Sequence, residues 1–326
     1  MKLFLDANIL LDFYRFGDDD ITEMGKLVAL LEGGELELYV NDHLKNEVIR
    51  NREKVIAESF PELQATKYKV RTPNYCSKLP ELAELRDALR TANEAHNRLV
   101  RALGEKISAN DLPADHLITS IFRNAAAIEL SSDILDRAQL RMSLANPPGK
   151  VGSLGDALHW ECLLTIDSGY GMRIVSRDGD FASELRPKEI KVLLSREWAG
   201  HFGKGASIKL YKSLSEFFRD EFPDIRISDE AAKNELISQL RLSPNFATTH
   251  SIVADLSQFK FFTNSQVRSL FEILVENTQV GWIASDADLQ EFYFSLQSKS
   301  YVVPNEIQDV AASLLEVQKD DFFLPF

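Results

Sequence analysis

Short apolar segments separated by stretches of helical length limit the fold of this 326-residue chain more than any other feature. Residues 2–6, KLFLD, have no polar alternation, which is typical of a strand covered on both faces. Similar strands are expected at 36–40 and 172–176, with weaker candidates at 190–194 and 206–211. Since strands that alternate with helices form parallel sheets, the sequence predicts an α/β fold with a central parallel sheet.

Helical patterns lie between these strands, and turn-forming residues separate them. Pro73 and Pro80 enclose a loop, and the Pro- and Gly-rich residues 146–153 form a clear break. The expected helices begin near residue 7 and cover residues 43–60, 81–107, 113–130, 131–144 and 153–166.

The pattern becomes wholly helical near residue 226. Helices are expected at 231–242, 263–277, 286–297 and 304–318. We therefore expect an α/β domain over residues 1–225 and a small all-α domain over residues 226–326.

Charge is distributed unevenly on this acidic chain. The net charge of −13 argues against binding nucleic acid through bulk charge. Residues 43–106 nevertheless hold 13 Lys and Arg against 9 Asp and Glu, whereas residues 226–326 hold 7 against 14. The sequence leaves open whether the first region is a basic binding face or an ordinary solvated helix surface.

Cysteine and hydropathy patterns indicate a reduced compartment and no membrane span. Cys76 and Cys162 are too few for a disulfide framework, so a cytoplasmic location is expected. No apolar run reaches the ~18 residues of a membrane helix, and the N-terminus lacks the features of a signal peptide. The histidines lack zinc-site spacing.

Asp6 places a charge inside an apolar segment, and burial of an ionised carboxylate is costly unless it is paired or binds a metal. Asp178 and Asp180 follow the strand at 172–176, so parallel pairing brings them to the same sheet edge. Glu47 and Asp156 can reach this edge from neighbouring helices. Clustered carboxylates favour a hard cation such as Mg²⁺ or Mn²⁺, which suits metal-assisted phosphoryl transfer.

Each carboxylate also has a simpler interpretation, which the sequence leaves open. Asp6 could cap a turn, and Glu47 could form ion pairs along its helix. Ser153 and Asp156 match the capping-box pattern. The aspartates on either side of Gly179 could be turn formers.

Four segments, taken together and in this order, resemble a PIN-domain nuclease: LFLDANILLD, NDHLKNEVIR, GSLGDALHWE and RIVSRDGDF. The resemblance covers roughly the first 200 residues and implies a three-layer fold. It also implies the use of Mg²⁺ or Mn²⁺ in cleaving RNA with a metal-activated water. The acidic ligands and catalytic residues that it implies are Asp6, Glu47, Asp156 and Asp178, with Asp180 as an auxiliary ligand and Asn8 and Ser176 as residues that orient the acids.

This chain departs from compact members of the family by a long helical insertion, at about residues 61–146, and by its C-terminal domain. The longer segment PPGKVGSLGDALHWE resembles a bacterial subgroup of the family. Around the site we expect Glu161 as an outer residue and Arg177 as a phosphate contact. Lys67, Lys69 and Arg71 are the expected substrate contacts in the basic region.

The expected activity is that of an endoribonuclease. A toxin or defence effector restrained by an inhibitory protein or by the C-terminal domain is the biological role considered. Single-stranded DNA as a substrate and a homo-oligomer stay open. A structure-specific DNA nuclease and an inert RNA-binding or assembly module are the alternatives. A phosphatase of the haloacid-dehalogenase type is disfavoured because Asn8 stands where that chemistry needs a second carboxylate.

Overall fold

A parallel sheet forms the centre of the protein. The computed structural model describes residues 1–15, 21–149, 153–166 and 171–323. Within these residues the sheet has five strands in the order β3-β2-β1-β4-β5, and every pairing is parallel. This confirms the predicted fold class. The strands are β1 (Lys2–Leu5), β2 (Glu37–Asn41), β3 (Ala126–Ile128), β4 (Met172–Val175) and β5 (Ile208–Tyr211).

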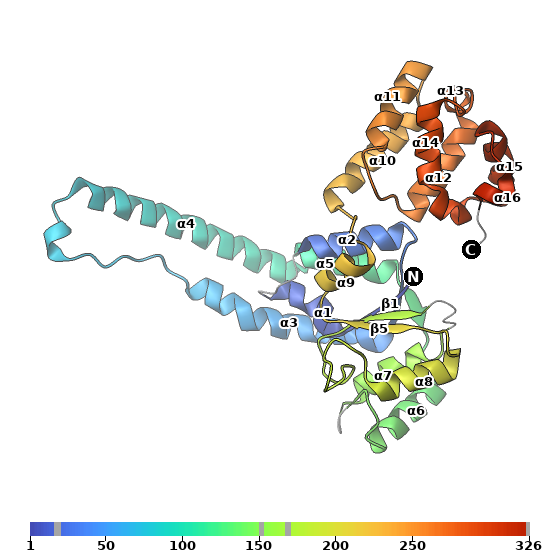
Figure 1. Cartoon of the computed structure of the whole chain (residues 1–326). Coiled ribbons are helices and arrows are strands. Elements are labelled where there is room, and N and C mark those ends of the chain that lie inside the picture. The colour runs from blue at the N-terminus through green and yellow to red at the C-terminus, as the bar shows by residue number, and fades with distance from the viewer. Residues whose placement is uncertain (16–20, 150–152, 167–170, 324–326) are drawn as a thin grey trace.

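Helices cover both faces of the sheet and make a three-layer arrangement (Figure 1). The layer with α6, α7 and α8 lies on one face, and α2, α5 and α9 lie on the other. The helices up to residue 225 are α1 (Ala7–Leu11), α2 (Ile21–Glu32), α3 (Asp42–Ala65), α4 (Pro80–Ala109), α5 (Pro113–Arg123), α6 (Ser132–Ser143), α7 (Leu154–Leu163), α8 (Val192–Phe202) and α9 (Leu214–Glu221), with 3-10 turns at Asp12–Tyr14 and Asn74–Cys76.

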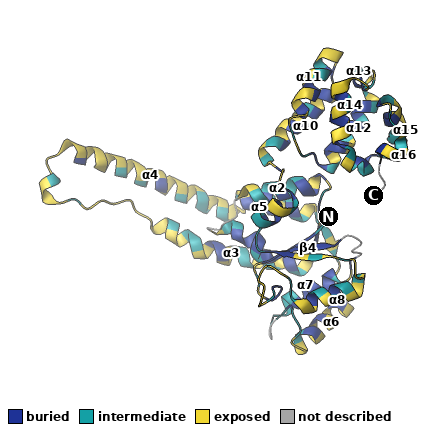
Figure 2. Cartoon of the chain, viewed as in Figure 1, coloured by how far each residue is buried: buried dark blue, intermediate teal, exposed yellow. Residues whose placement is uncertain are grey.

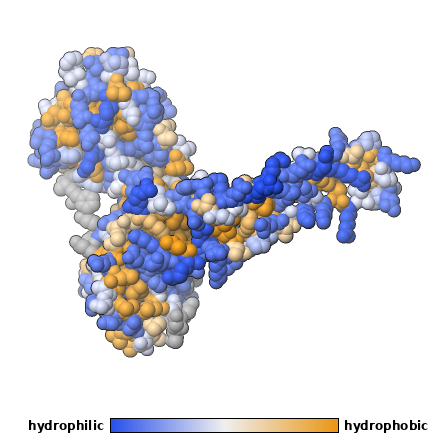
Figure 3. Space-filling view, turned by 180° about the vertical axis from the view of Figure 1, so that it is seen from behind, coloured by the Kyte–Doolittle hydropathy of each residue, from blue (hydrophilic) through white to orange (hydrophobic). Residues whose placement is uncertain are grey.

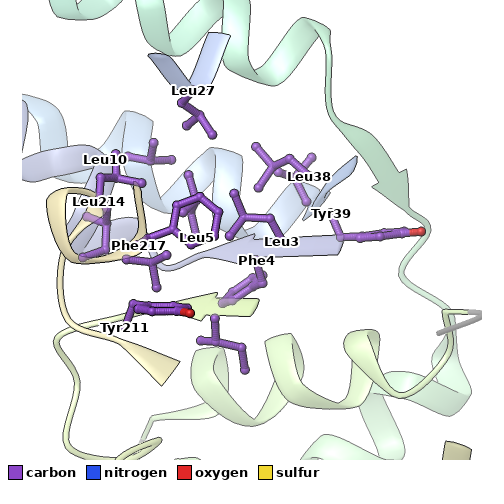
Figure 4. Close-up of a cluster of buried hydrophobic side chains, with 14 of the residues drawn as sticks. Leu3, Phe4, Leu5, Leu10, Leu27, Leu38, Tyr39, Tyr211, Leu214 and Phe217 are labelled. Atoms are coloured by element: carbon purple, nitrogen blue, oxygen red, sulfur yellow. The ribbon is translucent and has the colours of Figure 1, made fainter. Parts of the chain in front are cut away.

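Burial on both faces explains the unbroken apolar character of β1. Leu3 and Leu5 are completely buried and Phe4 is 2% exposed. Their side chains point alternately to the two faces, with Leu27 of α2 on the side of Leu3 and Leu5 (Figure 4). Helices therefore pack against both sides of the strand, as the missing polar alternation predicts.

Two local predictions are wrong. Residues 192–194, expected as a strand, begin α8, because Leu194, Trp198 and Phe202 recur at helical spacing against the core. The helix expected at 113–130 ends at Arg123, and residues 126–128 form β3, which pairs with β2. Pairing with the sheet overrides the helix propensity of the alanines in this segment.

The region expected as a helical insertion divides into two parts. The segment from α5 to α6 belongs to the sheet region, since β3 extends the sheet. The second half of α3, the extended residues 66–73 and α4 instead form an arm that projects from the body (Figure 1) and is mostly exposed (Figure 2). Asn93 of α4 fastens the extended segment, because its side chain bonds to both Tyr68 N and Tyr68 O.

The C-terminal region is helical and has its own core. A domain boundary near residue 226 stays a prediction. Most buried apolar residues up to Ile225 form one large cluster, with a smaller one between α6 and α7, and those from Ile237 to Phe323 form another. The helices are α10 (Ile227–Arg241), α11 (Phe246–Leu256), α12 (Asn264–Glu276), α13 (Thr278–Gly281), α14 (Ala287–Ser295), α15 (Asn305–Leu314) and α16 (Lys319–Phe322), with a 3-10 helix at Gln297–Val302. The sequence interpretation missed α11.

This region docks on the turn between α2 and β2. Lys299 Nζ bonds to Glu35 Oε1 at 2.6 Å and to Phe262 O at 2.5 Å. Gly33 O accepts from Ser265 N at 3.0 Å. Both contacts lie at the amino end of β2, which separates the docked helices from the carboxyl ends of the strands. Among the described helices, none is long and apolar enough to cross a lipid bilayer.

Buried ion pairs join α6, α7 and α8. Arg141 Nε donates to Glu161 Oε1 at 2.7 Å, and Arg141 Nη2 donates to Glu197 Oε2 at 2.8 Å. Arg137 also contacts Glu161, at 3.2 Å, but its side chain is 42% exposed, whereas that of Arg141 is 8% exposed. Trp160 donates to the same Glu197 oxygen, which fixes α7 against α8.

Substitution Arg141→Met should lower the unfolding free energy by about 3–5 kcal/mol, because it leaves the Glu161 carboxylate buried with only one partner. Arg137→Met is the matched control. It removes an exposed partner of the same carboxylate and should cost about 1 kcal/mol or less. Urea unfolding of both variants measures the difference, and equal losses would show that burial does not govern this network.

Candidate active site

Polar residues converge at the carboxyl ends of the central strands. Asp6 follows β1, Ser176 and Asp178 follow β4, and Lys212 follows β5. The strand register aligns them, because Asp6 N donates to Val175 O at 3.0 Å. Asp6 and the loop that follows β4 therefore lie at the same edge of the sheet, as expected from parallel pairing.

A pocket of about 330 Å³ opens at this edge. It brings together residues from the first strand–helix junction, from α3, from the start of α7 and from the loop after β4. Its lining residues are Asp6, Asn8, Leu11, Arg15, Glu47, Asn51, Lys54, Val55, Ser153, Asp156 and Asp178.

Asp6 is 6% exposed, and neighbouring polar groups hold its carboxylate. Its Oδ2 accepts from Asn8 Nδ2 at 2.8 Å and from Ser176 Oγ at 2.5 Å. Burial raises the pKa of Asp6, the Ser176 bond opposes this rise, and the nearby Glu47 and Asp178 charges add to it. Asn8 and Ser176 therefore both bind the Asp6 carboxylate, which the resemblance implies that they orient.

Three aspartates bring their carboxylates close together. Asp156, Asp178 and Asp180 each offer a carboxylate oxygen, and these oxygens all lie within 4.8 Å of one another. Asp178 Oδ1 also accepts from Asp180 N at 2.8 Å, so Asp178 shapes the turn as well as facing the pocket. Burial raises the pKa of Asp156 to about 6, the Ser153 hydrogen bond opposes the rise, and the Asp6 and Asp178 charges add to it.

Ser153 does not cap α7 through its side chain, although the sequence leaves that simpler interpretation open. Its hydroxyl donates to Asp156 Oδ2 at 3.0 Å, and its side chain makes no capping bond to the helix backbone. In the segment PPGKVGSLGDALHWE, residues 150–152 lie outside the described residues.

Glu47, on α3, lines the pocket and faces His159 of α7. Its Oε2 lies 3.6 Å from His159 Nε2. Contact with His159 lowers the pKa of Glu47, and burial opposes this. Glu47 thus faces a partner across the site, in place of the helical ion pairs considered from sequence.

The family model for the PIN domain matches residues 3–181. The chain belongs to the PIN-domain family. No curated protein and no solved structure matches it. PIN domains are generally nucleases that use divalent metals, and this chain has an acidic cluster able to hold one.

The donor set of this PIN domain fits a hard divalent cation. Asp156, Asp178 and Asp180 supply carboxylate oxygens alone, which is the chemistry that Mg²⁺ and Mn²⁺ prefer. A cation placed among them would relieve the like-charge repulsion that contributes to the raised pKa of Asp156.

Other expected site residues of the PIN domain lie elsewhere. Glu161 points to α6, where Arg141 and Arg137 pair with its carboxylate, so the structure does not bring it to the pocket. Arg177 is not among the residues that line the pocket, and its side chain pairs with Asp12 at 2.9 Å.

The three basic residues expected to contact substrate, Lys67, Lys69 and Arg71, are exposed on the arm. They do not line the pocket that holds the carboxylates. Any role in binding therefore concerns parts of a substrate outside the acidic pocket.

Several residues at the site were not found from sequence. His159 contacts Glu47, and Asn41 bonds to the other ring nitrogen of His159. Lys212 Nζ donates to Asp178 O at 3.3 Å, and Lys54 lines the pocket. Of these four residues, only Lys212 could have been found from the sequence, because it directly follows a predicted strand.

The pH dependence of stability should report the raised pKa of Asp156. Since this pKa is about 6, against an ordinary 3.8, its stabilising contribution is fully present below pH 3.8 and is lost as pH rises through 6. The ionised group should cost the metal-free protein about 3 kcal/mol. Asp156→Asn should therefore raise the thermal midpoint at pH 7.5 and leave it nearly unchanged at pH 4.

Asp42→Asn serves as the control, because the Asp42 side chain is 83% exposed. It should give no comparable dependence on pH. Thermal unfolding of the three proteins at both pH values provides the measurement. A lower midpoint for Asp156→Asn at pH 7.5 would contradict the electrostatic cost.

Proposed function

We propose that this protein is a divalent-metal-dependent endoribonuclease that hydrolyses RNA phosphodiester bonds. The observation that supports this most directly is the group formed by Asp156, Asp178 and Asp180, with Asp6 and Glu47 on the same pocket. Arg15 and Lys54 also line the pocket, so a phosphodiester that enters it has positively charged groups beside the acids.

The roles of the acids follow from their surroundings. Asp156, Asp178 and Asp180 would hold Mg²⁺ or Mn²⁺, and Glu47 and Asp6 would complete the negative wall. A cation held there would activate a water and would stabilise negative charge in the transition state. Asn8 and Ser176 hold the Asp6 carboxylate in one orientation, because both donate to its Oδ2.

The arm supplies a surface suited to single-stranded RNA. Residues 63–80 include four basic residues and no acidic residue, on a chain whose net charge is −13. Tyr75, near the tip, is 83% exposed, and Tyr68 is 46% exposed. Basic groups that bind the backbone and aromatic rings that stack on bases are the usual elements of such surfaces. Figure 3 shows a mainly hydrophilic arm with apolar patches along it.

The biological setting is part of the same proposal. It includes a toxin or defence role with an inhibitory protein partner, since a nuclease of this kind needs restraint. It also includes a cytoplasmic location and a homo-oligomer. A structure-specific DNA nuclease is the alternative, since the pocket chemistry is the same for both nucleic acids.

Purified protein should cut labelled single-stranded RNA with Mg²⁺ or Mn²⁺ and should be inactive with EDTA. Asp178→Asn should lower the rate by about 100-fold or more, the scale of losing one electrostatic contact to the reacting group. Gel analysis of RNA and DNA of one sequence measures both activity and preference.

Asp42→Asn, on the exposed face of α3, should retain the full rate. Preferential cleavage of DNA would favour the alternative. Failure of a monodisperse sample to cut either polymer with either metal would contradict the proposed activity.

Charge reversal of Lys67, Lys69 and Arg71 to Glu should weaken RNA binding. If all three contact phosphates, the slope of log affinity against log salt should become shallower by about 2 for a single strand. The inactive Asp178→Asn background allows this to be measured by fluorescence anisotropy without cleavage.

Reversal of Lys204, Arg219 and Lys260 changes the net charge equally, on exposed residues outside the arm. This control should retain most of the affinity and the salt slope. Equal losses in the two triple variants would mean that net charge, and not the arm, governs binding.

A further inference from the structure

His159 lies against the pocket with its ring almost completely enclosed. It is 1% exposed, and the rings of Phe4 and His43 each lie 5.4 Å from it, centroid to centroid. Among the described residues, its Nε2 has no hydrogen-bond partner within ordinary distance, and Glu47 Oε2 is 3.6 Å away. Nε2 is therefore directed at a carboxylate of the acidic pocket.

The position of the proton on this ring follows from Asn41, which is 2% exposed. Asn41 Oδ1 accepts from Leu44 N at 2.9 Å, where it caps α3, so the amide cannot reverse without losing this bond. Asn41 Nδ2 therefore faces His159 Nδ1, at 3.1 Å. Since an amide nitrogen only donates, Nδ1 must accept, and the single proton stands on Nε2.

We propose that His159 is a positioning residue that donates from Nε2 to Glu47 and holds this carboxylate at the acidic pocket. Glu47 is one-third exposed on its side chain, so a small rotation closes the 3.6 Å separation to a hydrogen bond. Asn41 acts behind it by fixing the tautomer. This deepens the proposed function, and its metal-binding test rests on the acidic pocket as a metal site.

A metal site formed by His43, Glu47 and His159 is the competing interpretation, since their donor atoms also lie within 4.8 Å of one another. A metal would need the lone pair of Nε2 and hence a proton on Nδ1. That proton would point at the Asn41 amide hydrogens. To avoid this clash, the Asn41 amide would have to turn over and lose the hydrogen bond from Leu44 N that caps α3. The hydrogen-bond pattern thus favours donation to Glu47 over metal binding.

Nitrogen spectra of ¹⁵N-histidine-labelled protein test the tautomer directly. The expected result is a neutral His159 ring protonated at Nε2, with or without added Zn²⁺. A proton on Nδ1, or coordination of Zn²⁺ at Nε2, would overturn the proposal. This readout does not depend on nuclease activity.

Matched variants test the positioning role through Mn²⁺ affinity, measured by calorimetry. His159→Leu removes the donor and should weaken binding about 10-fold, as changes behind a ligand commonly do. His159→Gln places an amide donor near the position of Nε2 and should restore most of the affinity. His43→Gln should leave the affinity unchanged. Urea midpoints establish that each variant is folded.

Two results would contradict the positioning role. Equal losses in folded His159→Gln and His159→Leu would show that donation to Glu47 is not what matters. An equal loss in His43→Gln would favour a metal site that includes both histidines. Absence of Mn²⁺ binding in the unchanged protein would instead contradict the proposed function, and the nitrogen spectra would still decide the tautomer.

Discussion

The parallel pairing of β1 with β4 is the constraint on which the candidate site depends. Leu5 aligns with Val175, and the next residues, Asp6 and Ser176, bond to each other through their side chains. Both strands are buried on both faces, so a slip of one residue would place these polar groups in the core and apolar groups at the edge. The apolar residues of β1 and the acidic pocket are therefore consequences of one register.

The same arrangement concentrates unfavourable charge, which the rest of the domain must offset. Burial and neighbouring acids raise the pKa of Asp6 and Asp156, so both carboxylates destabilise the metal-free fold when they ionise. Asp156 stands in the first turn of α7, and the buried pairs between Arg141, Glu161 and Glu197 fix that helix. Local cost at a functional site, supported by rigid surroundings, is a common arrangement in enzymes.

The sequence predicted what depends on local pattern and missed what depends on contacts between distant elements. Asp6 could be found because a charge interrupts an apolar strand and parallel strands share a carboxyl edge. Glu161 looked equally suitable on its helix, yet arginines of α6 use its carboxylate. His159 could not be assigned, since its function depends on Asn41, which lies 118 positions earlier. β3 was missed because pairing with β2, and not the propensity of its alanines, makes it a strand.

One helix connects the acidic pocket to the arm, and this limits the substrates that can use both. Glu47, Asn51 and Lys54 line the pocket from α3, which continues to Ala65, directly before the basic residues of the arm. At 1.5 Å per residue, the distance along α3 from Glu47 to Ala65 is about 27 Å. A dinucleotide can occupy the acids but cannot reach the basic segment. If the arm binds the substrate, that substrate is a chain of several nucleotides, and the arm adds affinity without changing the chemistry at the acids.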